Sequence, residues 1–414
     1  MPTNPLETGD EFVPTTQGEL RRWVEENAAQ RKGTIYPVGG RTALNYGGPA
    51  TIPGTLVSLS KLTQTVDFPA RDMTITVEAG LRMDELAAQL RAEGQQLPVD
   101  AAQSHRATVG GVVATDTSGP RRFGYGTMRD YVIGITAVDA HGREFHTGGR
   151  VVKNVAGYDL CKMLVGSLGT LAVITQLTLR LKPLPETTAV LWSSFSSLTE
   201  IDAALEGLID SAVHPVVLEV FNAGAAKQIS TESRQELSAE LPVLAVGLEG
   251  SPRDVKWQIE RLTQELSSAN STRIDVVQDK NAAQLLQAFT EFQTTSNDPL
   301  TFQANLLPSK TLEFVEHATQ QEITVQAHAG SGIVIGHLPD KAASVEQAAD
   351  IVTPLRQLAR RCRGNLVILG CETDWKRHLP VFGDPEPSAP LMQRLKSALD
   401  PDNLLNPGRF VNSF

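Results

Sequence analysis

Three glycine-rich clusters are the parts of this 414-residue chain whose residue types best suit the binding of a ligand. They are residues 36–48 (YPVGGRTALNYGG), 107–119 (ATVGGVVATDTSG) and 166–176 (GSLGTLAVITQ). Glycine serves where a backbone turns sharply or must approach something closely. Successive backbone N–H groups in such turns form a concave nest for phosphate oxygens. A tight turn explains any single glycine pair equally well, but three neighbouring clusters indicate a bound anion.

The second cluster also contains a predicted helix start. Thr108 is placed to cap a helix whose first N–H groups lie at Gly110 and Gly111, and a helix start attracts anions through its dipole. Two anion-binding turns far apart in sequence suit a dinucleotide, whose pyrophosphate needs donors from both sides. The sequence has neither G-x-G-x-x-G nor G-x-x-x-x-G-K-[ST], which disfavours NAD on a Rossmann domain and ATP on a P-loop.

Composition excludes several classes of protein. The net charge of -10 argues against a nucleic-acid-binding protein. The three cysteines are too few for an iron–sulfur cluster and form no disulfide framework, which favours a reducing compartment. The first 20 residues lack the basic and apolar blocks of a signal peptide. Residues 163–181 are apolar but interrupted by glycine and polar residues, and they predict a helix end and a buried strand rather than a membrane span.

Hydrophobic periodicity predicts where helices and strands lie along the chain. Helices are expected within residues 13–33 and 82–98, with strands between them and a hairpin at 132–149 that turns at His141 and Gly142. Glycine becomes sparse after residue 186, and strands alternate with amphipathic helices to about residue 340. The last predicted helix ends at an Asp-Pro pair. The whole pattern is that of an α+β or α/β layer fold.

The motifs TVGGVVATDTSG, YG..RDYV and GSLGTLAVIT resemble the FAD-binding domain of the vanillyl-alcohol oxidase and p-cresol methylhydroxylase family. SGPRRFGYGTMRDYVIGI and VVKNVAGYDLCKMLVGSLGTL are similar to the FAD-binding subunit of bacterial glycolate oxidase, and ALDPDNLLNPGRF resembles the family's C-terminal signature. The resemblance implies an α+β fold with a two-subdomain FAD-binding domain and an α+β cap domain. The implied boundaries are 1–186 for the N-terminal part of the FAD-binding domain, 187–342 for the cap, and 343–414 for a segment returning towards the FAD-binding domain.

The same resemblance implies which residues hold FAD. Pyrophosphate contacts fall on the first loop, at Val38, Gly39, Gly40, Arg41 and Thr42. Flavin and ribityl contacts fall on Pro98, Thr108, Gly110, Gly111, Ala114, Ser118 and Gly119. Gly157, Gly166 and Gly169 would let the backbone pass close to the flavin and its ADP arm, with Ile174 on the adenine side.

The chain departs from the family pattern in the first loop. Arg41 stands where a third glycine is usual, and Ala43 stands where a lysine is common. No histidine precedes Ser104, so the covalent histidine link of some family members is not available. We therefore expect noncovalent FAD.

Removal of a hydride from a 2-hydroxy acid needs a cation for the carboxylate and a base for the hydroxyl. Arg121 and Arg122 suit a carboxylate clamp, or form a solvated or subunit-facing pair. Lys153, Tyr158 and Asp159 either face the flavin or fix the turn at Gly157. Catalytic residues stay unassigned.

The segment AHAGSGIVIGH resembles the H-x-G-D-G-N-x-H motif of related flavoproteins that oxidise 2-hydroxy acids. His328 and Gly330 match, whereas Ser331, Ile333 and Ile335 replace the Asp, the Asn and the second His. His337 comes two positions late. We predict no metal site. The loss of these motif residues indicates that the chain does not oxidise substrate alone.

The sequence thus predicts an FAD-dependent oxidoreductase, as a redox subunit of a complex that oxidises glycolate or a similar 2-hydroxy acid. The expected partners are a catalytic flavoprotein subunit and an iron–sulfur subunit, in a cytoplasmic hetero-oligomer that meets a membrane only through those partners. Two alternatives stay open: a stand-alone FAD-dependent dehydrogenase of another small hydroxylated substrate, and an FAD-containing assembly subunit without turnover. The sequence assigns neither the substrate nor the natural electron acceptor.

Overall fold

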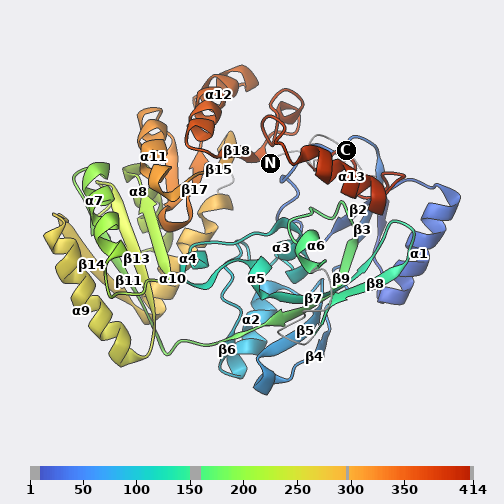
Figure 1. Cartoon of the computed structure of the whole chain (residues 1–414), viewed down its shortest axis with the longest axis horizontal. Helices are drawn as coiled ribbons and strands as arrows, with labels where there is room; N and C mark the ends of the chain where they lie inside the picture. Colours follow the sequence, from blue (N-terminus) through green and yellow to red (C-terminus); the bar gives the residue numbers. More distant parts are fainter. Residues whose placement is uncertain (1–9, 150–159, 295–297, 411–414) are drawn as a thin grey trace. The chain divides into compact units, whose positions relative to one another are not determined.

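The computed structural model describes residues 10–149, 160–294 and 298–410, and the chain divides into two compact units (Figure 1). The first unit comprises Met1–Ser118, Thr127–Leu184 and Glu372–Phe414, and the second comprises Gly119–Gly126 and Pro185–Cys371. Both combine helices with sheets, which confirms the α+β class. We keep the domain boundaries after residues 186 and 342 as a proposal.

The first unit contains a small parallel sheet in the order β1-β3-β2. Its strands are Asp10–Phe12 (β1), Gly54–Ser58 (β3) and Thr34–Val38 (β2). The predicted first helix is α1 (Gln17–Gln30), whose start is capped by Thr16 and which buries Leu20 and Val24. The buried strand β2 delivers the chain directly into the first glycine cluster.

A five-stranded antiparallel sheet forms the rest of the first unit, in the order β4-β5-β9-β7-β8. The strands are Thr65–Asp67 (β4), Thr74–Glu78 (β5), Val173–Arg180 (β9), Val132–Val138 (β7) and Glu144–Gly148 (β8). The β7–β8 hairpin confirms the predicted turn at His141 and Gly142. Gly142 has φ 79°, and a Cβ there would lie 2.7 Å from the backbone nitrogen of Glu25, so this turn requires glycine.

Shorter elements complete the first unit. They are the helices α2 (Met83–Ala92), α3 (Val109–Thr115), α5 (Met128–Tyr131), α6 (Cys161–Leu164) and α13 (Ala389–Leu399), the 3-10 turns η1 (Ala70–Asp72) and η5 (Trp375–Arg377), and the strand pair β6 (Gln95–Gln96) and β10 (Lys182–Pro183). The C-terminal run beyond α13 returns to β2, where Ile35 forms a parallel bridge with Leu405.

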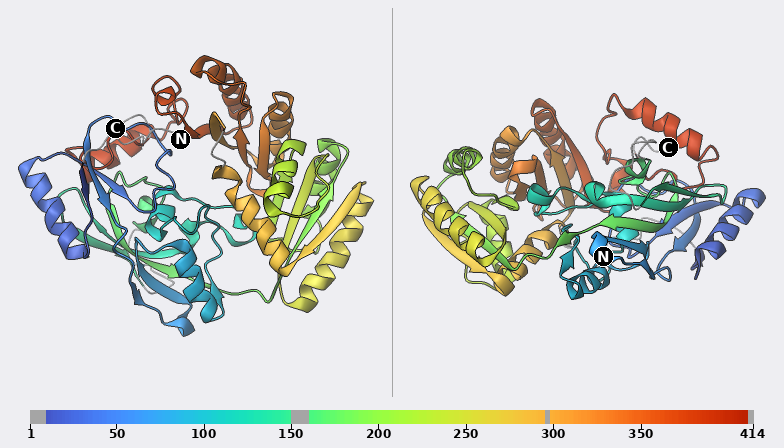
Figure 2. Two further views of the ribbon diagram at one scale, coloured as in Figure 1. Left: turned by 180° about the vertical axis from the view of Figure 1, so that it is seen from behind. Right: turned by 60° about the horizontal axis from the view of Figure 1, so that its bottom comes forward.

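The second unit is built on an eight-stranded antiparallel sheet in the order β14-β11-β13-β12-β16-β17-β15-β18. The strands are Thr187–Ser194 (β11), Val217–Phe221 (β12), Val243–Gly250 (β13), Arg273–Gln278 (β14), Leu300–Asn305 (β15), Thr324–His328 (β16), Ile333–His337 (β17) and Asn365–Cys371 (β18). The helices are α4 (Arg122–Tyr125), α7 (Leu198–Ile209), α8 (Ala223–Ser233), α9 (Pro252–Ser268), α10 (Asp279–Glu291), α11 (Thr311–Gln320) and α12 (Val345–Arg361). The 3-10 turns are η2 (Phe292–Thr294), η3 (Pro308–Lys310) and η4 (Ala329–Ser331). The rear view in Figure 2 shows the long helix α9 alongside the strands of this sheet, against which it packs.

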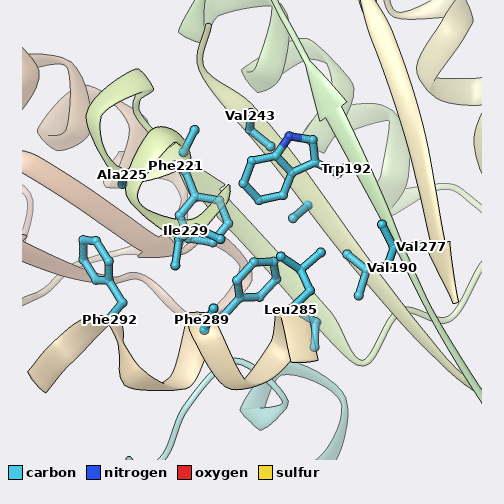
Figure 3. Packing of buried hydrophobic residues seen from close by; sticks show 14 of the residues in the cluster. Val190, Trp192, Phe221, Ala225, Ile229, Val243, Val277, Leu285, Phe289 and Phe292 are labelled. Atoms are coloured by element: carbon cyan, nitrogen blue, oxygen red, sulfur yellow. The ribbon is translucent and has the colours of Figure 1, made fainter. Parts of the chain in front are cut away.

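An aromatic core fixes the centre of the second unit, as Figure 3 shows. The ring centroids of Trp192 and Phe221 lie 5.5 Å apart, and those of Phe221 and Phe289 lie 4.8 Å apart. The indole N–H of Trp192 donates to the carbonyl oxygen of Ser238 at 2.7 Å, so the buried ring has no unmet donor. This packing holds β12 in place against α10. No helix of the described ranges is long and apolar enough to cross a membrane.

Candidate functional site

The three glycine clusters converge within the first unit. A Cβ on Gly39 would lie 2.1 Å from Oγ1 of Thr108, so the first cluster touches the second. The backbone N–H of Gly166 donates to the carbonyl oxygen of Val113 at 2.9 Å, so the second cluster touches the third. Glycine is required at Gly39 for this close approach.

The first loop, residues 39–42, presents open backbone donors. Among residues 10–149, 160–294 and 298–410, no acceptor partners the backbone N–H groups of residues 39–42. Three of these residues are half-buried, and only Arg41 is exposed. A run of four unpartnered donors, three of them on half-buried residues, suits a pyrophosphate, whose oxygens only accept.

Arg41 has a backbone role in this loop. Its φ of 59° lies in the left-handed region that favours glycine, at the position where the family usually has a third glycine. The guanidinium Nη2 of Arg41 lies 2.6 Å from the Glu11 carboxylate, and both side chains are partly exposed. The side chain of Arg41 is therefore engaged with Glu11 rather than held over the loop.

The second cluster differs from the sequence-based interpretation. Thr108 caps α3, as expected, and accepts from the N–H of Gly111 at 3.3 Å. However, the N–H of Gly110 donates to the carbonyl oxygen of Ala79 at 2.8 Å. The anion nest proposed at Gly110 and Gly111 is therefore wrong, because their N–H groups are already bonded within the protein. Gly110 serves close packing, since a Cβ there would lie 2.6 Å from Cβ of Ala79.

The third cluster is held by the C-terminal run. Gly169 has φ 67°, and a Cβ there would lie 2.9 Å from Nδ2 of Asn406. The same Nδ2 donates to the carbonyl oxygen of Leu168 at 2.7 Å. Ile174 is buried on β9, opposite Ala137 of β7.

The remaining predicted contacts are placed as follows. Val38 and Pro98 are buried, and Ala114 and Ser118 are half-buried. Gly119 is buried and is counted with the second unit. Gly157, Lys153, Tyr158 and Asp159 lie outside the described residues. Contact of all these residues with a flavin stays a prediction.

Arg409 is a residue that sequence reasoning missed. Its guanidinium is buried and donates to the carbonyl oxygens of Leu44, Tyr46 and Gly48 at 2.6, 2.6 and 2.7 Å. Burial lowers the pKa of Arg409 to about 10, so the group stays charged at neutral pH. Within the described ranges no carboxylate pairs with it. Buried positive charge that is balanced only by peptide dipoles favours an anion nearby.

Lys376 on η5 contacts the same turn. Its buried Nζ donates to the carbonyl oxygens of Asn45 and, at 3.2 Å, Gly47. Two buried cations from the C-terminal run therefore fix residues 44–48, directly after the loop with open donors. In the sequence, the ALDPDNLLNPGRF signature indicated that the C-terminal run matters. It did not reveal the contacts of Arg409 and Lys376 with residues 44–48.

A buried ion pair anchors the other side of the site. Nζ of Lys396 lies 2.5 Å from the Asp400 carboxylate and donates to the carbonyl oxygens of Thr170 and Leu405, both at 2.8 Å. Burial lowers the pKa of Lys396, an effect that the bond to Asp400 opposes. The C-terminal run thus binds both the first and the third glycine clusters.

The second unit carries the remaining candidates. Nη1 of Arg121 lies 3.5 Å from the buried Glu249, whose carboxylate also accepts from Tyr125 Oη at 2.8 Å. The β16–β17 register pairs His328 with Ile333 and His337 with Thr324, at opposite ends of the hairpin. The two histidines therefore cannot ligate one metal ion. In the described ranges, no group of three or more His, Cys, Asp or Glu side chains could hold a metal.

Comparisons with known proteins agree with this geometry. Residues 11–148 match the family model of an FAD binding domain. Residues 184–367 and 379–410 match the model for the C-terminal domain of FAD linked oxidases. The fold is that of p-cresol methylhydroxylase, with a TM-score of 0.75, 16% identity, and 98% of this chain and 90% of that chain covered.

Three curated relatives match nearly the whole chain. A glycolate oxidase subunit, GlcD, of Bacillus subtilis is 26% identical over 96% of this chain and 88% of its own length. A D-2-hydroxyglutarate dehydrogenase of Xanthomonas citri pv. viticola is 29% identical over 95% of this chain and 86% of its own length. A D-lactate dehydrogenase of Archaeoglobus fulgidus is 28% identical over 91% of this chain and 86% of its own length. The chain belongs to the FAD-linked oxidase family and is an FAD-dependent oxidoreductase with a fold of the vanillyl-alcohol oxidase type.

Proposed function

We propose that this chain is the FAD-binding redox subunit of a complex that oxidises a small 2-hydroxy acid, with glycolate as the first candidate. The names of the three relatives support this substrate class, because glycolate, D-lactate and D-2-hydroxyglutarate share a hydroxyl group next to a carboxylate. The FAD-binding part of the proposal is carried by the row of four open N–H groups at residues 39–42, beside a turn fixed by buried Arg409.

The chain's own residues would hold FAD as follows. Residues 39–42 would donate to the pyrophosphate, and Arg409 and Lys376 would lower the cost of placing that charge in the protein. Bound FAD supplies a two-electron acceptor. No histidine stands in the first loop to link the flavin, so binding is noncovalent.

The arrangement of the second unit favours a subunit over a complete enzyme. His328 and His337 lie at opposite ends of one hairpin, so the eroded motif cannot act as a two-histidine site. A catalytic flavoprotein would then supply that site, and an iron–sulfur subunit would carry electrons onward. All three cysteines are buried and none forms a disulfide, which supports a reducing, cytoplasmic compartment.

Co-purification tests the assembly. The tagged chain should be co-expressed with a catalytic flavoprotein and an iron–sulfur protein and then purified by affinity. Both partners should be recovered with it in fixed proportion. Recovery of the chain alone under mild salt contradicts the subunit assignment.

A second candidate is a stand-alone dehydrogenase. The match to the D-lactate dehydrogenase of Archaeoglobus fulgidus, which covers 91% of this chain and 86% of that protein, is the observation that favours this alternative, because that relative is named as a dehydrogenase rather than as a subunit. Saturable turnover of one hydroxy acid by the purified chain alone would support it.

A further inference from the structure

Strand β14 is an open edge of the second unit's eight-stranded sheet (Figure 1). In the described part of the chain its one neighbouring strand is β11, and the two strands pair without a register shift. An edge strand offers unpaired N–H and C=O groups, which proteins usually protect with lysine, proline or a bulge. The β14 sequence RIDVVQ contains neither lysine nor proline. The strand is therefore competent to pair with another strand.

The outward backbone groups of β14 belong to Ile274 and Val276. The N–H of Thr272 donates to the carbonyl oxygen of Ser194 at 2.8 Å, so the backbone of Ser194 faces β14. Ser194 pairs with Arg273, whose N–H and C=O groups therefore face β11. These groups alternate in direction along an antiparallel strand, so those of Ile274 and Val276 point away from the sheet.

The side chains of β14 are self-complementary in charge. Arg273 and Asp275 are two residues apart and share one face of the strand. Nη2 of Arg273 lies 2.8 Å from the Asp275 carboxylate, and the two side chains are 58% and 19% exposed. If the β14 of a second copy runs antiparallel, with the two Ile274 residues opposite each other, Arg273 of each copy lies opposite Asp275 of the other. The four charges then alternate in sign across the strand pair, and opposite charges in such cross-strand positions are stabilising.

The neighbouring registers lack this complementarity. A pair centred on Arg273 places two arginines opposite each other, and a pair centred on Asp275 places two aspartates opposite each other. Like charges in directly opposite positions are destabilising, so charge selects the register centred on Ile274. The other face of the strand agrees with this register, because the β-branched Ile274 then lies opposite itself and Val276 lies opposite Thr272. Val276 is 42% exposed, so pairing would bury apolar surface.

We propose that β14 is an interface between two copies of this chain, which associate as an antiparallel pair of edge strands centred on Ile274. A two-fold interface needs a surface that complements itself, and the alternating charges of Arg273 and Asp275 provide one. The inference goes beyond the proposed function, which concerns the reaction and the other subunits.

Sedimentation velocity of the FAD-loaded full chain, without other subunits, tests the proposal. We expect a monomer–dimer equilibrium that shifts towards the dimer as the concentration rises. Arg273→Asp places only acidic side chains on the charged face of the pair, and Asp275→Arg places only arginines there. Each variant should raise the Kd of the dimer at least about tenfold, because like charges then lie opposite each other. Flavin content and the apparent Tm show whether each variant has folded.

A mixture of the two variants separates charge pairing from a merely structural effect. Arg273→Asp and Asp275→Arg chains in equal amounts should form a heterodimer, although neither variant associates with itself. One chain then carries two positive charges and the other two negative charges, so every cross-strand pair is of opposite sign. The double variant with both substitutions in one chain should recover the wild-type dimer for the same reason. Damage to the fold of either chain would not be repaired by mixing.

Two further variants test the location. Arg261→Asp is the matched control, because Arg261 forms a comparable ion pair with Glu265 at 2.6 Å on α9 and is 51% exposed. This variant should keep the wild-type Kd of the dimer. Ile274→Pro removes an outward N–H and none of the bonds to β11, and proline is tolerated at such edge positions. It should abolish the dimer and leave the flavin content unchanged.

The outcomes decide between the possible occupants of this edge. A chain that stays monomeric at every concentration contradicts the proposal. A dimer whose Kd is unchanged by both charge reversals also contradicts it, because association then uses another surface. If the wild-type chain is monomeric and Arg273→Asp abolishes recovery of a catalytic flavoprotein or an iron–sulfur protein, β14 binds a different subunit and self-pairing is wrong. A charge-dependent dimer supports the inference whether or not any complex oxidises a 2-hydroxy acid.

Discussion

Gly48 and Arg409 are bonded to each other in both directions, although 361 positions separate them in the chain. Nη1 of Arg409 donates to the carbonyl oxygen of Gly48 at 2.7 Å, and the N–H of Gly48 donates to the carbonyl oxygen of Arg409 at 3.1 Å. A Cβ on Gly48 would lie 2.3 Å from the carbonyl oxygen of Gly408, so no larger residue fits there. Gly408 and Arg409 thus shape the turn that follows the predicted pyrophosphate loop.

Arg409→Gln should weaken FAD binding by at least about tenfold, because it removes a buried positive charge beside the predicted pyrophosphate loop and the hydrogen bonds that fix residues 44–48 after that loop. Fluorescence titration of the apoprotein with FAD measures this change. Arg21→Gln, which removes the same charge from an exposed position on α1, should leave the FAD Kd unchanged. Equal FAD affinity in the Arg409 variant and the wild type would show that this arginine has no part in the cofactor site.

Arg41→Gly should leave the FAD Kd within about threefold of the wild type. The substitution relieves a left-handed φ of 59° and removes an exposed ion pair with Glu11 at 2.6 Å. Exposed pairs contribute about 0–1 kcal/mol, and glycine adopts this conformation without strain. A loss of affinity above about thirtyfold would instead show that the Arg41 side chain contacts the pyrophosphate. FAD titration of this variant beside the wild type decides the question.

Local signals predicted much of the fold. The caps at Thr16 and Thr108 and the turn at Gly142 depend on residues within a few positions of one another, so the sequence reveals them directly. Contacts between distant segments carry no such signal. The bonds from Arg409 and Lys376 to residues 44–48 became visible only in the folded chain.

The same limit explains the error in the second glycine cluster. The pattern around Gly110 predicts a helix start with open donors, but Ala79, at the end of β5, takes the N–H of Gly110. From the sequence pattern alone, Gly39→Val and Gly110→Val are expected to remove FAD and leave the fold largely intact. The structure corrects this: the added side chains would meet Thr108 Oγ1 and Ala79 Cβ, with their Cβ atoms at 2.1 and 2.6 Å, so loss of FAD would come with loss of stability.

Lys396→Met should lower the free energy of unfolding by about 3–5 kcal/mol, because it leaves the buried carboxylate of Asp400 without its cation. Urea unfolding of the apoprotein measures the change. The double variant Lys396→Met with Asp400→Asn should recover part of the loss, because the neutral amide leaves no buried charge unpaired. The recovery should be incomplete, since the N–H groups of Leu404 and Leu405 bond to different carboxylate oxygens at 2.8 and 2.7 Å and the amide has a single oxygen. An additive double variant would show that the two side chains do not depend on each other.

Acid precipitation of the purified yellow protein should release all of its flavin into the supernatant as FAD. The reason is the absence of histidine before Ser104, which leaves the first loop without the usual residue for covalent attachment. Absorbance of the supernatant and of the redissolved pellet at the flavin maximum measures the partition. Flavin that stays with the denatured protein would contradict noncovalent binding.

Dye-linked oxidation of glycolate, by the lone chain and by the chain assembled with its partners, tests the central claim most directly. His328 and His337 stand at opposite ends of one hairpin and cannot form a two-histidine site. The chain's three cysteines are too few for an iron–sulfur cluster of its own. The FAD-loaded lone chain should therefore show little or no glycolate or D-lactate dehydrogenase activity, and activity should appear on co-expression with a catalytic flavoprotein and an iron–sulfur subunit. Saturable, flavin-dependent turnover of glycolate by the lone chain would contradict the subunit assignment and establish a stand-alone dehydrogenase.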